Sequence, residues 1–120
     1  MAEFRLAVRT RPLPGREAEY HEWYDGFHLD EVLRVPGFVA AERYAPLPDG
    51  VGAGSAEDGD YLALFTIESE DIAATVAAFR AAQRTMAQPP CLDPDSVVLA
   101  WWRPLGTRRT RPSPADAPGT

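Results

Sequence analysis

The stretch YLALFTI at residues 61–67 decides the fold, because it is apolar at nearly every position. A β-strand directs alternate residues to opposite faces of a sheet, so this strand presents apolar side chains to both faces. Residues 96–103, SVVLAWWR, repeat the pattern and place Trp101 and Trp102 on opposite faces. An antiparallel sheet with one face in water alternates apolar with polar residues instead. We therefore expect a sheet that is covered on both faces.

Two more strands and two helices are predicted around these segments. Alternation and helical spacing of apolar residues predict strands at residues 4–10 and 38–44 and helices at residues 16–25 and 70–86. Regular alternation in the second strand places Phe38 and Arg43 on opposite faces. Gly26 is expected to weaken or end the first helix, and residues 28–34 to add a further turn or two.

The resulting order, β-α-β-β-α-β, is the ferredoxin-like pattern of the α+β class. Right-handed crossovers place both helices on one face of a four-stranded antiparallel sheet. The chain has no further segment to cover the other face, and a second copy of the chain is the simplest cover. We therefore predict a homodimer in which two sheets pack face to face as a barrel, with the helices outside.

The length of 120 residues and an apolar content of 45% fit one globular domain. We assign this domain to residues 1–105. Residues 106–120 contain Pro, Arg and Ser and few apolar residues, so we expect a disordered basic tail. Residues 45–59 are rich in Gly and Pro and are predicted to form a long loop.

Charge and composition exclude several classes of function. Residues 1–105 carry nine Arg and seventeen acidic residues, which argues against a nucleic-acid partner. The absence of lysine excludes a lysine Schiff base and a lysine-type P-loop. No apolar run approaches the ~20 residues that span a bilayer, the N-terminus lacks a secretory signal, and Cys91 has no second cysteine to pair with. We expect a cytoplasmic protein that binds neither nucleic acid nor membrane.

Residues 17–36, EAEYHEWYDGFHLDEVLRVP, hold both histidines of the chain. On a helix, His21, Asp25 and His28 fall at i, i+4 and i+7, beside an aromatic side. His28 lies between two apolar residues, so we expect its imidazole to be partly enclosed near carboxylates and a tyrosine. Such a histidine is a candidate general acid or base. The alternative is that the aromatic residues belong to the core and that His28 caps a helix end.

The same region resembles a known family. The resemblance rests on YHEWYD at residues 20–25, His28, Val32-Leu33, VPGF at residues 35–38, and Arg43-Tyr44. Over residues 4–103 the chain resembles the EthD-like branch of the dimeric α+β barrel superfamily. The resemblance implies a homodimeric barrel with a ligand cleft between helices and sheet, and a role for Trp23, Tyr24 and His28. Relatives include muconolactone isomerase, cofactor-free quinone-forming monooxygenases and olivetolic acid cyclase.

The leading hypothesis is an enzyme that needs no cofactor and moves a proton, as a cyclase, an isomerase, or a dehydratase or related lyase does. The expected substrate is an apolar, oxygenated aromatic or polyketide-like molecule. His28 would be the general acid or base, Tyr24 would donate a hydrogen bond to an enolate oxygen, and Asp25 would orient an imidazole. The pocket is expected to be walled by aromatic residues: Trp23, Phe27, Tyr20, Phe4, Phe38 and Phe65.

Three alternatives stay open. A cofactor-free monooxygenase of the same fold would use the same residues to deprotonate a substrate that then reacts with oxygen. A non-catalytic small-molecule-binding or assembly protein would not need the histidines. His21, Asp25 and His28 also have the spacing of metal ligands on a helix. No further histidine exists to complete that set, and we expect no metal.

Overall fold

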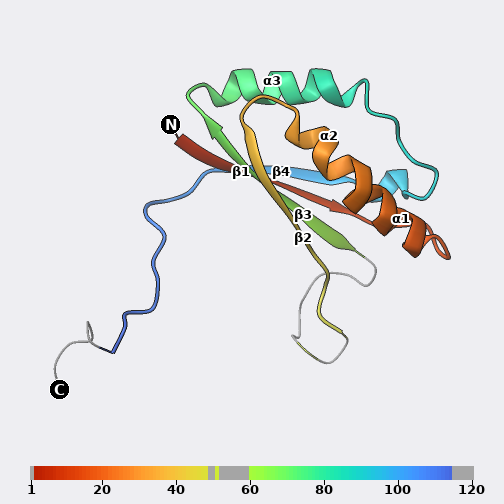
Figure 1. The fold of residues 1–120 in the computed structure, drawn as a ribbon, viewed down its shortest axis with the longest axis horizontal. Coiled ribbons are helices and arrows are strands. Elements are labelled where there is room, and N and C mark those ends of the chain that lie inside the picture. The colour runs from red at the N-terminus through yellow and green to blue at the C-terminus, as the bar shows by residue number, and fades with distance from the viewer. Residues whose placement is uncertain (1, 49–50, 52–59, 115–120) are drawn as a thin grey trace.

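The computed structural model describes residues 2–48, 51 and 60–114 (Figure 1). Its strands are β1 (Ala2–Thr10), β2 (Phe38–Tyr44), β3 (Tyr61–Ser69) and β4 (Val98–Trp102). One continuous helical segment comprises α1 (Glu17–Trp23), a π-helical turn (Tyr24–His28) and α2 (Leu29–Leu33). The other helix is α3 (Ile72–Gln83), and a 3₁₀ turn (Pro94–Ser96) precedes β4.

The four strands form one antiparallel sheet in the order β2-β3-β1-β4. Figure 1 shows α1, α2 and α3 on the same side of this sheet. β1 and β3 are the central strands and pair along their whole length, from Ala2 with Ser69 to Thr10 with Tyr61. This is the ferredoxin-like arrangement, so the predicted α+β fold class is confirmed.

The core lies between the sheet and the helices. Its largest fully buried side chains come from both layers: Tyr20, Phe65, Leu6, Ile67 and Val32. Phe38 of β2 stacks on Phe79 of α3, with ring centroids 5.5 Å apart and planes at 17°. Apolar burial and aromatic stacking of this kind hold the two layers together.

A bulge in β2 changes which of its residues share a face. The pairing of β2 with β3 shifts register between Phe38 and Ala40. Phe38 and Arg43 both lie opposite buried residues of β3, namely Ile67 and Ala63. The prediction that Phe38 and Arg43 face opposite sides is therefore wrong, because an extra residue in a bulge reverses the alternation beyond it. The bulge turns Arg43 toward α1.

Of the two effects expected of Gly26, weakening or ending the first helix, the structure excludes the second, and the predicted further turns follow it. The chain stays helical through Leu33, and the N–H of Leu29 donates to the carbonyl of Tyr24, five residues earlier. This bond defines a π-helical turn. A Cβ at Gly26 would meet nothing within 4 Å. The glycine therefore lowers helix stability through its backbone entropy but does not terminate the helix.

The ends of the other elements differ modestly from prediction. α3 begins later than residue 70 because Asp71 caps it: the Asp71 carboxylate accepts the N–H of Ala74 at 3.2 Å. It ends at Gln83 instead of residue 86. β1 begins at Ala2, β3 extends to Ser69, and β4 is shorter than residues 96–103.

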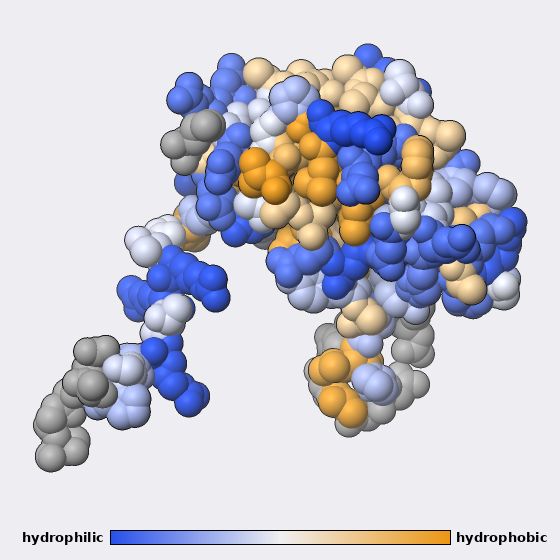
Figure 2. All heavy atoms as spheres, in the orientation of Figure 1, coloured by the Kyte–Doolittle hydropathy of each residue, from blue (hydrophilic) through white to orange (hydrophobic). Residues whose placement is uncertain are grey.

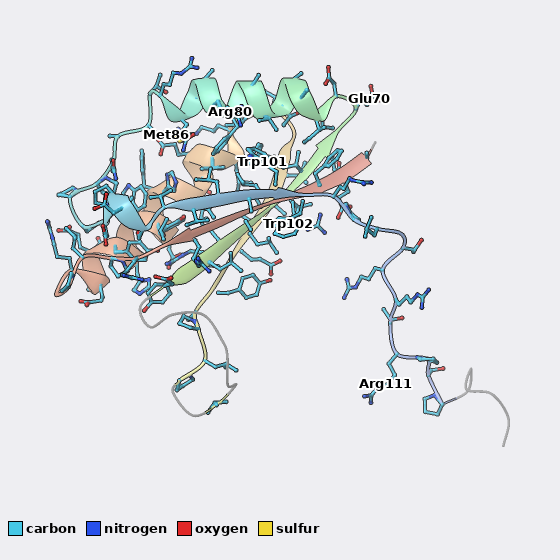
Figure 3. All side chains as sticks on the ribbon, turned by 180° about the vertical axis from the view of Figure 1, so that it is seen from behind. Glu70, Arg80, Met86, Trp101, Trp102 and Arg111 are labelled. Atoms are coloured by element: carbon cyan, nitrogen blue, oxygen red, sulfur yellow. The ribbon has the colours of Figure 1, made fainter. Side chains whose placement is uncertain are left out.

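The sheet face opposite the helices is not covered by the described residues. Figure 3 shows Trp101 on the α3 side of β4 and Trp102 on the opposite side, and Trp102 is 61% exposed. At the centre of this face, Ala7 pairs with Leu64 of β3 and with an alanine of β4. The two faces of β3 and β4 are thus both apolar, as the sequence pattern predicts.

The described part of the tail, residues 106–114, contains no helix or strand and is exposed. Figures 1 and 2 show it running away from the sheet with a largely hydrophilic surface. The rest of the predicted tail (residues 115–120) and most of the predicted loop (residues 49–50 and 52–59) lie outside the described residues. Among the helices that the structure describes, none is long and apolar enough to cross a membrane.

Candidate functional site

A cavity of about 340 Å³ opens between the sheet and the helices. Its walls come from three parts of the chain: Val8, Thr10, Phe65, Val97 and Leu99 near the sheet; Trp23, Tyr24, His28, Val32, Phe79, Gln83 and Met86 from the helices and the end of α3; and Ala87, Gln88, Pro89, Leu92 and Pro94 from the segment that follows. Most of these side chains are apolar. A cavity of this size and composition fits a small, largely apolar molecule that carries a few polar atoms.

His28 is the lining residue whose proton titrates near neutral pH. Its ring stacks on Trp23, with centroids 4.3 Å apart and planes at 15°, and meets Tyr24 edge-on at 5.2 Å. Its Nδ1 lies 2.9 Å from Oε1 of Glu31. Burial lowers the pKa of His28, and the hydrogen bond and charge of Glu31 act in the opposite direction. The imidazole is therefore neutral at pH 7 and able to accept a proton.

The π-helical turn explains how Trp23 and His28 come to stack. They stand five residues apart, and an α-helix would rotate residues at this spacing by about 140° from each other. A π-helical turn closes its hydrogen bond over one residue more than an α-helical turn. Residues five apart then lie closer to one face of the helix, which brings the two rings into contact.

Tyr24 is a hydrogen-bond donor in the cavity wall. Its side chain is almost fully buried, and this burial, together with the charge of Tyr20, raises the pKa of Tyr24 to about 12, against the opposing effects of Thr10 and Arg43. The phenol stays protonated at physiological pH and can donate to an oxygen atom of a bound molecule. The guanidinium carbon of Arg43 lies 4.5 Å from the centroid of the Tyr24 ring. This cation–π contact stabilises the ring position.

Asp25 belongs to a second polar cluster, formed with Arg43 and His21. Arg43 donates from Nη1 to Oδ1 of Asp25 at 2.9 Å and from Nη2 to Nδ1 of His21 at 3.0 Å. Burial, and next the charge of Arg43, lower the pKa of His21. Asp25 thus pairs with Arg43, whereas His28 pairs with Glu31.

The three residues with metal-ligand spacing therefore do not converge on one point. His21 and Asp25 both bind the guanidinium of Arg43, and His28 faces the cavity. Within residues 2–48, 51 and 60–114, no group of three His, Cys, Asp or Glu side chains could hold a metal ion.

The structure brings four of the predicted site residues together at the cavity: His28, Tyr24, Trp23 and Phe65. The others lie elsewhere. Phe4, Phe38 and Tyr20 pack in the hydrophobic core, and the Tyr20 hydroxyl is 2.5 Å from Oγ1 of Thr10. Phe27 is 50% exposed, and Asp25 points to Arg43 as described above.

Several residues of the site were not predicted. Glu31 stands three residues after His28, and this i, i+3 spacing places two side chains side by side on a helix. The sequence therefore carried a signal for the His28–Glu31 pair. Gln83 and Gln88 add polar atoms to the cavity wall, but they are remote from His28 in sequence, and no local pattern connects them to it.

The sequence matches no protein-family model and no curated protein. Its fold is similar to solved structures. An ethyl tert-butyl ether D (EthD) family protein from Bacillus halodurans has a TM-score of 0.56 at 13% identity, over 85% of this chain and 99% of that chain. A dimeric ferredoxin-like protein of unknown function from Thermobifida fusca has a TM-score of 0.52 at 17% identity, over 85% of this chain and 91% of that chain.

A third similar structure is a monooxygenase from Streptomyces coelicolor in complex with nanaomycin D. Its TM-score is 0.50 at 19% identity, over 92% of this chain and 94% of that chain. At such identities these likenesses establish the fold. The predicted resemblance to dimeric α+β barrel proteins, with an EthD family protein among them, is confirmed at this level.

Proposed function

We propose that this protein is a cofactor-free enzyme that transfers a proton on a small, largely apolar, oxygenated substrate. One observation carries the proposal: the rings of His28 and Tyr24 lie in contact on the wall of a cavity that is mostly apolar. In a low-dielectric cavity, a base beside a hydrogen-bond donor suits chemistry in which a proton leaves carbon while charge develops on oxygen.

The chemical step follows from this arrangement. His28 takes a proton from a carbon next to a carbonyl group, the C–H electron pair forms the new C=C bond, and the π electron pair of the carbonyl group moves onto the oxygen. Tyr24 donates its O–H to that oxygen. The imidazolium of His28 then returns the proton at another atom of the enolate, for an isomerisation, or gives it to a leaving hydroxyl group, for a dehydration. Cyclisation results when the enolate carbon attacks a second carbonyl group of the substrate and the imidazolium of His28 gives its proton to the alkoxide that forms there.

We further propose that the working form is a homodimer. The open sheet face carries Trp102, Leu64 and Ala7, and apolar side chains on an exposed face favour burial against a partner. A protein with a similar fold is described as dimeric. Two sheets packed face to face leave each cavity on its own helix side, so each subunit keeps a complete set of the residues named above.

Deuterium exchange at the methylene carbon of benzoylacetone tests the proton-transfer proposal and does not require the natural substrate. In D₂O, ¹H NMR reports the rate at which the methylene signal disappears. We expect the wild-type protein to accelerate this exchange, and His28→Asn to lower the enzymatic rate by about 10²–10⁴-fold. Asparagine keeps a hydrogen-bond donor beside Glu31, so the fold is expected to persist.

His21→Asn is the matched control, since His21 is the other histidine of the chain and does not line the cavity. Its exchange rate should equal that of the wild type. Equal rates for the wild type and His28→Asn, with benzoylacetone bound, would remove His28 from catalysis and favour a binding protein. Oxygen consumption during the same assay would favour a monooxygenase of this fold instead.

A further inference from the structure

The His28–Glu31 pair lies between the cavity and a second hollow on the outside of the helices. His28 lines the cavity, whereas Glu31 lines a groove of about 320 Å³ together with Arg34 of the turn after α2 and residues of α3. Both side chains are mostly buried, at 17% and 18% exposure. Glu31 is not among the residues that line the cavity, so its carboxylate contacts the imidazole from outside the cavity lining.

The geometry of the pair determines where the imidazole proton resides. A carboxylate accepts hydrogen bonds and cannot donate them when ionised. At 2.9 Å from Oε1 of Glu31, Nδ1 of His28 must therefore carry the proton. The neutral ring then has its lone pair on Nε2, the ring nitrogen that Glu31 does not contact. The His28 ring lies at 15° to the plane of the Trp23 ring on which it stacks. This stacking opposes a flip of the imidazole that would exchange its two nitrogens.

We propose that Glu31 is the positioning residue of the site: its carboxylate fixes His28 in the tautomer that leaves Nε2 free as a base toward the cavity, and it stabilises the imidazolium that forms when Nε2 takes a proton. The catalytic meaning of this inference rests on the proposed function, whereas the tautomer itself is a property of the free protein. The proton moves from the substrate C–H to Nε2, and Nδ1 keeps its own proton throughout.

This inference also narrows the substrate class. A neutral imidazole that is bonded to a carboxylate takes a proton from the substrate. The substrate is therefore an acid: a carbon acid activated by a carbonyl group, or a phenol. The titratable groups in contact with the His28 ring are Glu31 and Tyr24. Tyr24 is uncharged at neutral pH because its pKa is raised to about 12. Glu31 is therefore the contacting group that supplies charge to stabilise the imidazolium.

His21 provides an internal reference, because its hydrogen bond has the opposite sense. A guanidinium donates and never accepts, so Nδ1 of His21 accepts from Nη2 of Arg43 at 3.0 Å. Neutral His21 must then carry its proton on Nε2. The chain has two histidines, and the structure assigns them opposite tautomers. A spectrum of the full-length protein therefore contains both the test signal and its reference.

Two-dimensional ¹H–¹⁵N spectra of the imidazole nitrogens test this assignment in uniformly ¹⁵N-labelled protein. Above the titration range, we expect the protonated-nitrogen shift at Nδ1 for His28 and at Nε2 for His21. His21→Asn assigns the signals by removing one set. A His28 spectrum with the proton on Nε2 in the wild-type protein would overturn the proposal.

Three variants separate the charge of Glu31 from its hydrogen bond. Glu31→Gln keeps an oxygen that accepts from Nδ1, so the His28 tautomer should persist while the pKa of His28 falls further. Glu31→Leu removes the acceptor, and His28 should shift to the Nε2-protonated form. Asp30→Asn removes the same charge from an exposed neighbour and should leave both the tautomer and the pKa unchanged. Wild-type tautomer and pKa in both Glu31 variants would overturn the proposal.

Kinetics with benzoylacetone connect the tautomer to turnover. If exchange is catalysed, Glu31→Gln should lower kcat more than it changes KM, and the acidic limb of the pH–rate profile should move to lower pH with the pKa of His28. A profile that stays in place would refute the stabilisation of the imidazolium by Glu31. If the wild-type protein catalyses no exchange, the proposed function fails, and the spectra still decide the role of Glu31.

Discussion

Replacing Trp102 by Asp is expected to separate the homodimer while leaving the fold of each subunit intact. Trp102 stands on the open sheet face, away from α3 (Figure 3), and 61% of it is exposed within one chain. In the proposed barrel this exposed part is covered by the partner sheet. The substitution therefore removes apolar contact area and places a carboxylate in the interface.

The magnitude follows from the exposed area. A tryptophan side chain buries up to about 250 Å², and 61% of that area, at ~25 cal/mol per Å², corresponds to about 3–4 kcal/mol per subunit. Both subunits lose this contribution, so the dimer loses about 6–8 kcal/mol. At 1.4 kcal/mol per tenfold change, Kd rises by about 10⁴-fold to 10⁶-fold. An unpaired carboxylate in the interface increases the loss.

Size-exclusion chromatography with light scattering measures this effect at micromolar concentration. The wild-type protein should have twice the chain mass of 13.2 kDa, and Trp102→Asp should have the mass of one chain with an unchanged far-ultraviolet circular dichroism spectrum. A wild-type mass near 13.2 kDa, or an undiminished dimer in the variant, would refute the face-to-face barrel.

Trp101→Asp is the matched control from the adjacent position. Trp101 lies between the sheet and α3, with its ring centroid 5.5 Å from that of Phe79 and 6.4 Å from that of Phe38. Removing such a core ring typically costs about 3–5 kcal/mol of folding stability. Urea denaturation should therefore show a lower free energy of unfolding of the subunit itself for Trp101→Asp, whereas the loss for Trp102→Asp should be that of dissociation alone.

Four further outcomes are expected. Tyr24→Phe should lower kcat by an amount corresponding to about 2–4 kcal/mol, as expected for an oxyanion donor, while Tyr20→Phe, whose ring does not line the cavity, should affect stability but not turnover. Gly26→Ala should stabilise the fold in urea by about 1 kcal/mol, since its Cβ meets open space; a loss of stability would show that the π-helical turn requires glycine. Folding stability should fall as pH drops from neutral through the ordinary histidine pKa of 6.5, because both histidines have lowered pKa values and the unfolded chain therefore binds more protons; an unchanged urea midpoint between pH 7.5 and 5.5 would contradict this. We propose that residues 1–105 form the complete domain, so deleting residues 106–120 should leave the melting temperature and dimer mass unchanged; a truncated protein that fails to dimerise would place part of the tail in the interface.

The order of elements could be predicted from sequence because each strand and helix has a strong local pattern. The strand at residues 61–67 is apolar on both faces, and the apolar residues of α3 have helical spacing. Such patterns span only a few residues, so they can be recognised without knowledge of the tertiary packing. The ends of elements were less predictable, because capping bonds such as that of Asp71 set them individually.

The cavity was predicted only in part, for two physical reasons. Tyr20 packs in the core and Trp23 lines the cavity, yet both belong to the same aromatic side of the helix. The sequence pattern does not distinguish these two environments. Whether such a side chain packs in the core or lines a cavity depends on its distance from the sheet, and no local sequence pattern encodes that distance. The bulge in β2 is the second reason, because a one-residue register shift moved Arg43 to the helix side, where it pairs with Asp25.

The π-helical turn connects these two outcomes. On a regular α-helix, His21, Asp25 and His28 share one side, since residues seven apart are rotated by about 20° from each other. The additional residue in the turn at Tyr24–His28 rotates everything after it, so His28 leaves the side of His21 and Asp25. Arg43, turned inward by the bulge, binds His21 before the turn and Asp25 within it, whereas Trp23 and Glu31 contact His28, the last residue of the turn. Contacts on both sides thus favour the wide turn over a regular helix. The π-helical turn therefore separates His28 from His21 and Asp25, so that the three cannot ligate one metal ion. It also places the neutral imidazole of His28, bonded to the Glu31 carboxylate, on the wall of the cavity.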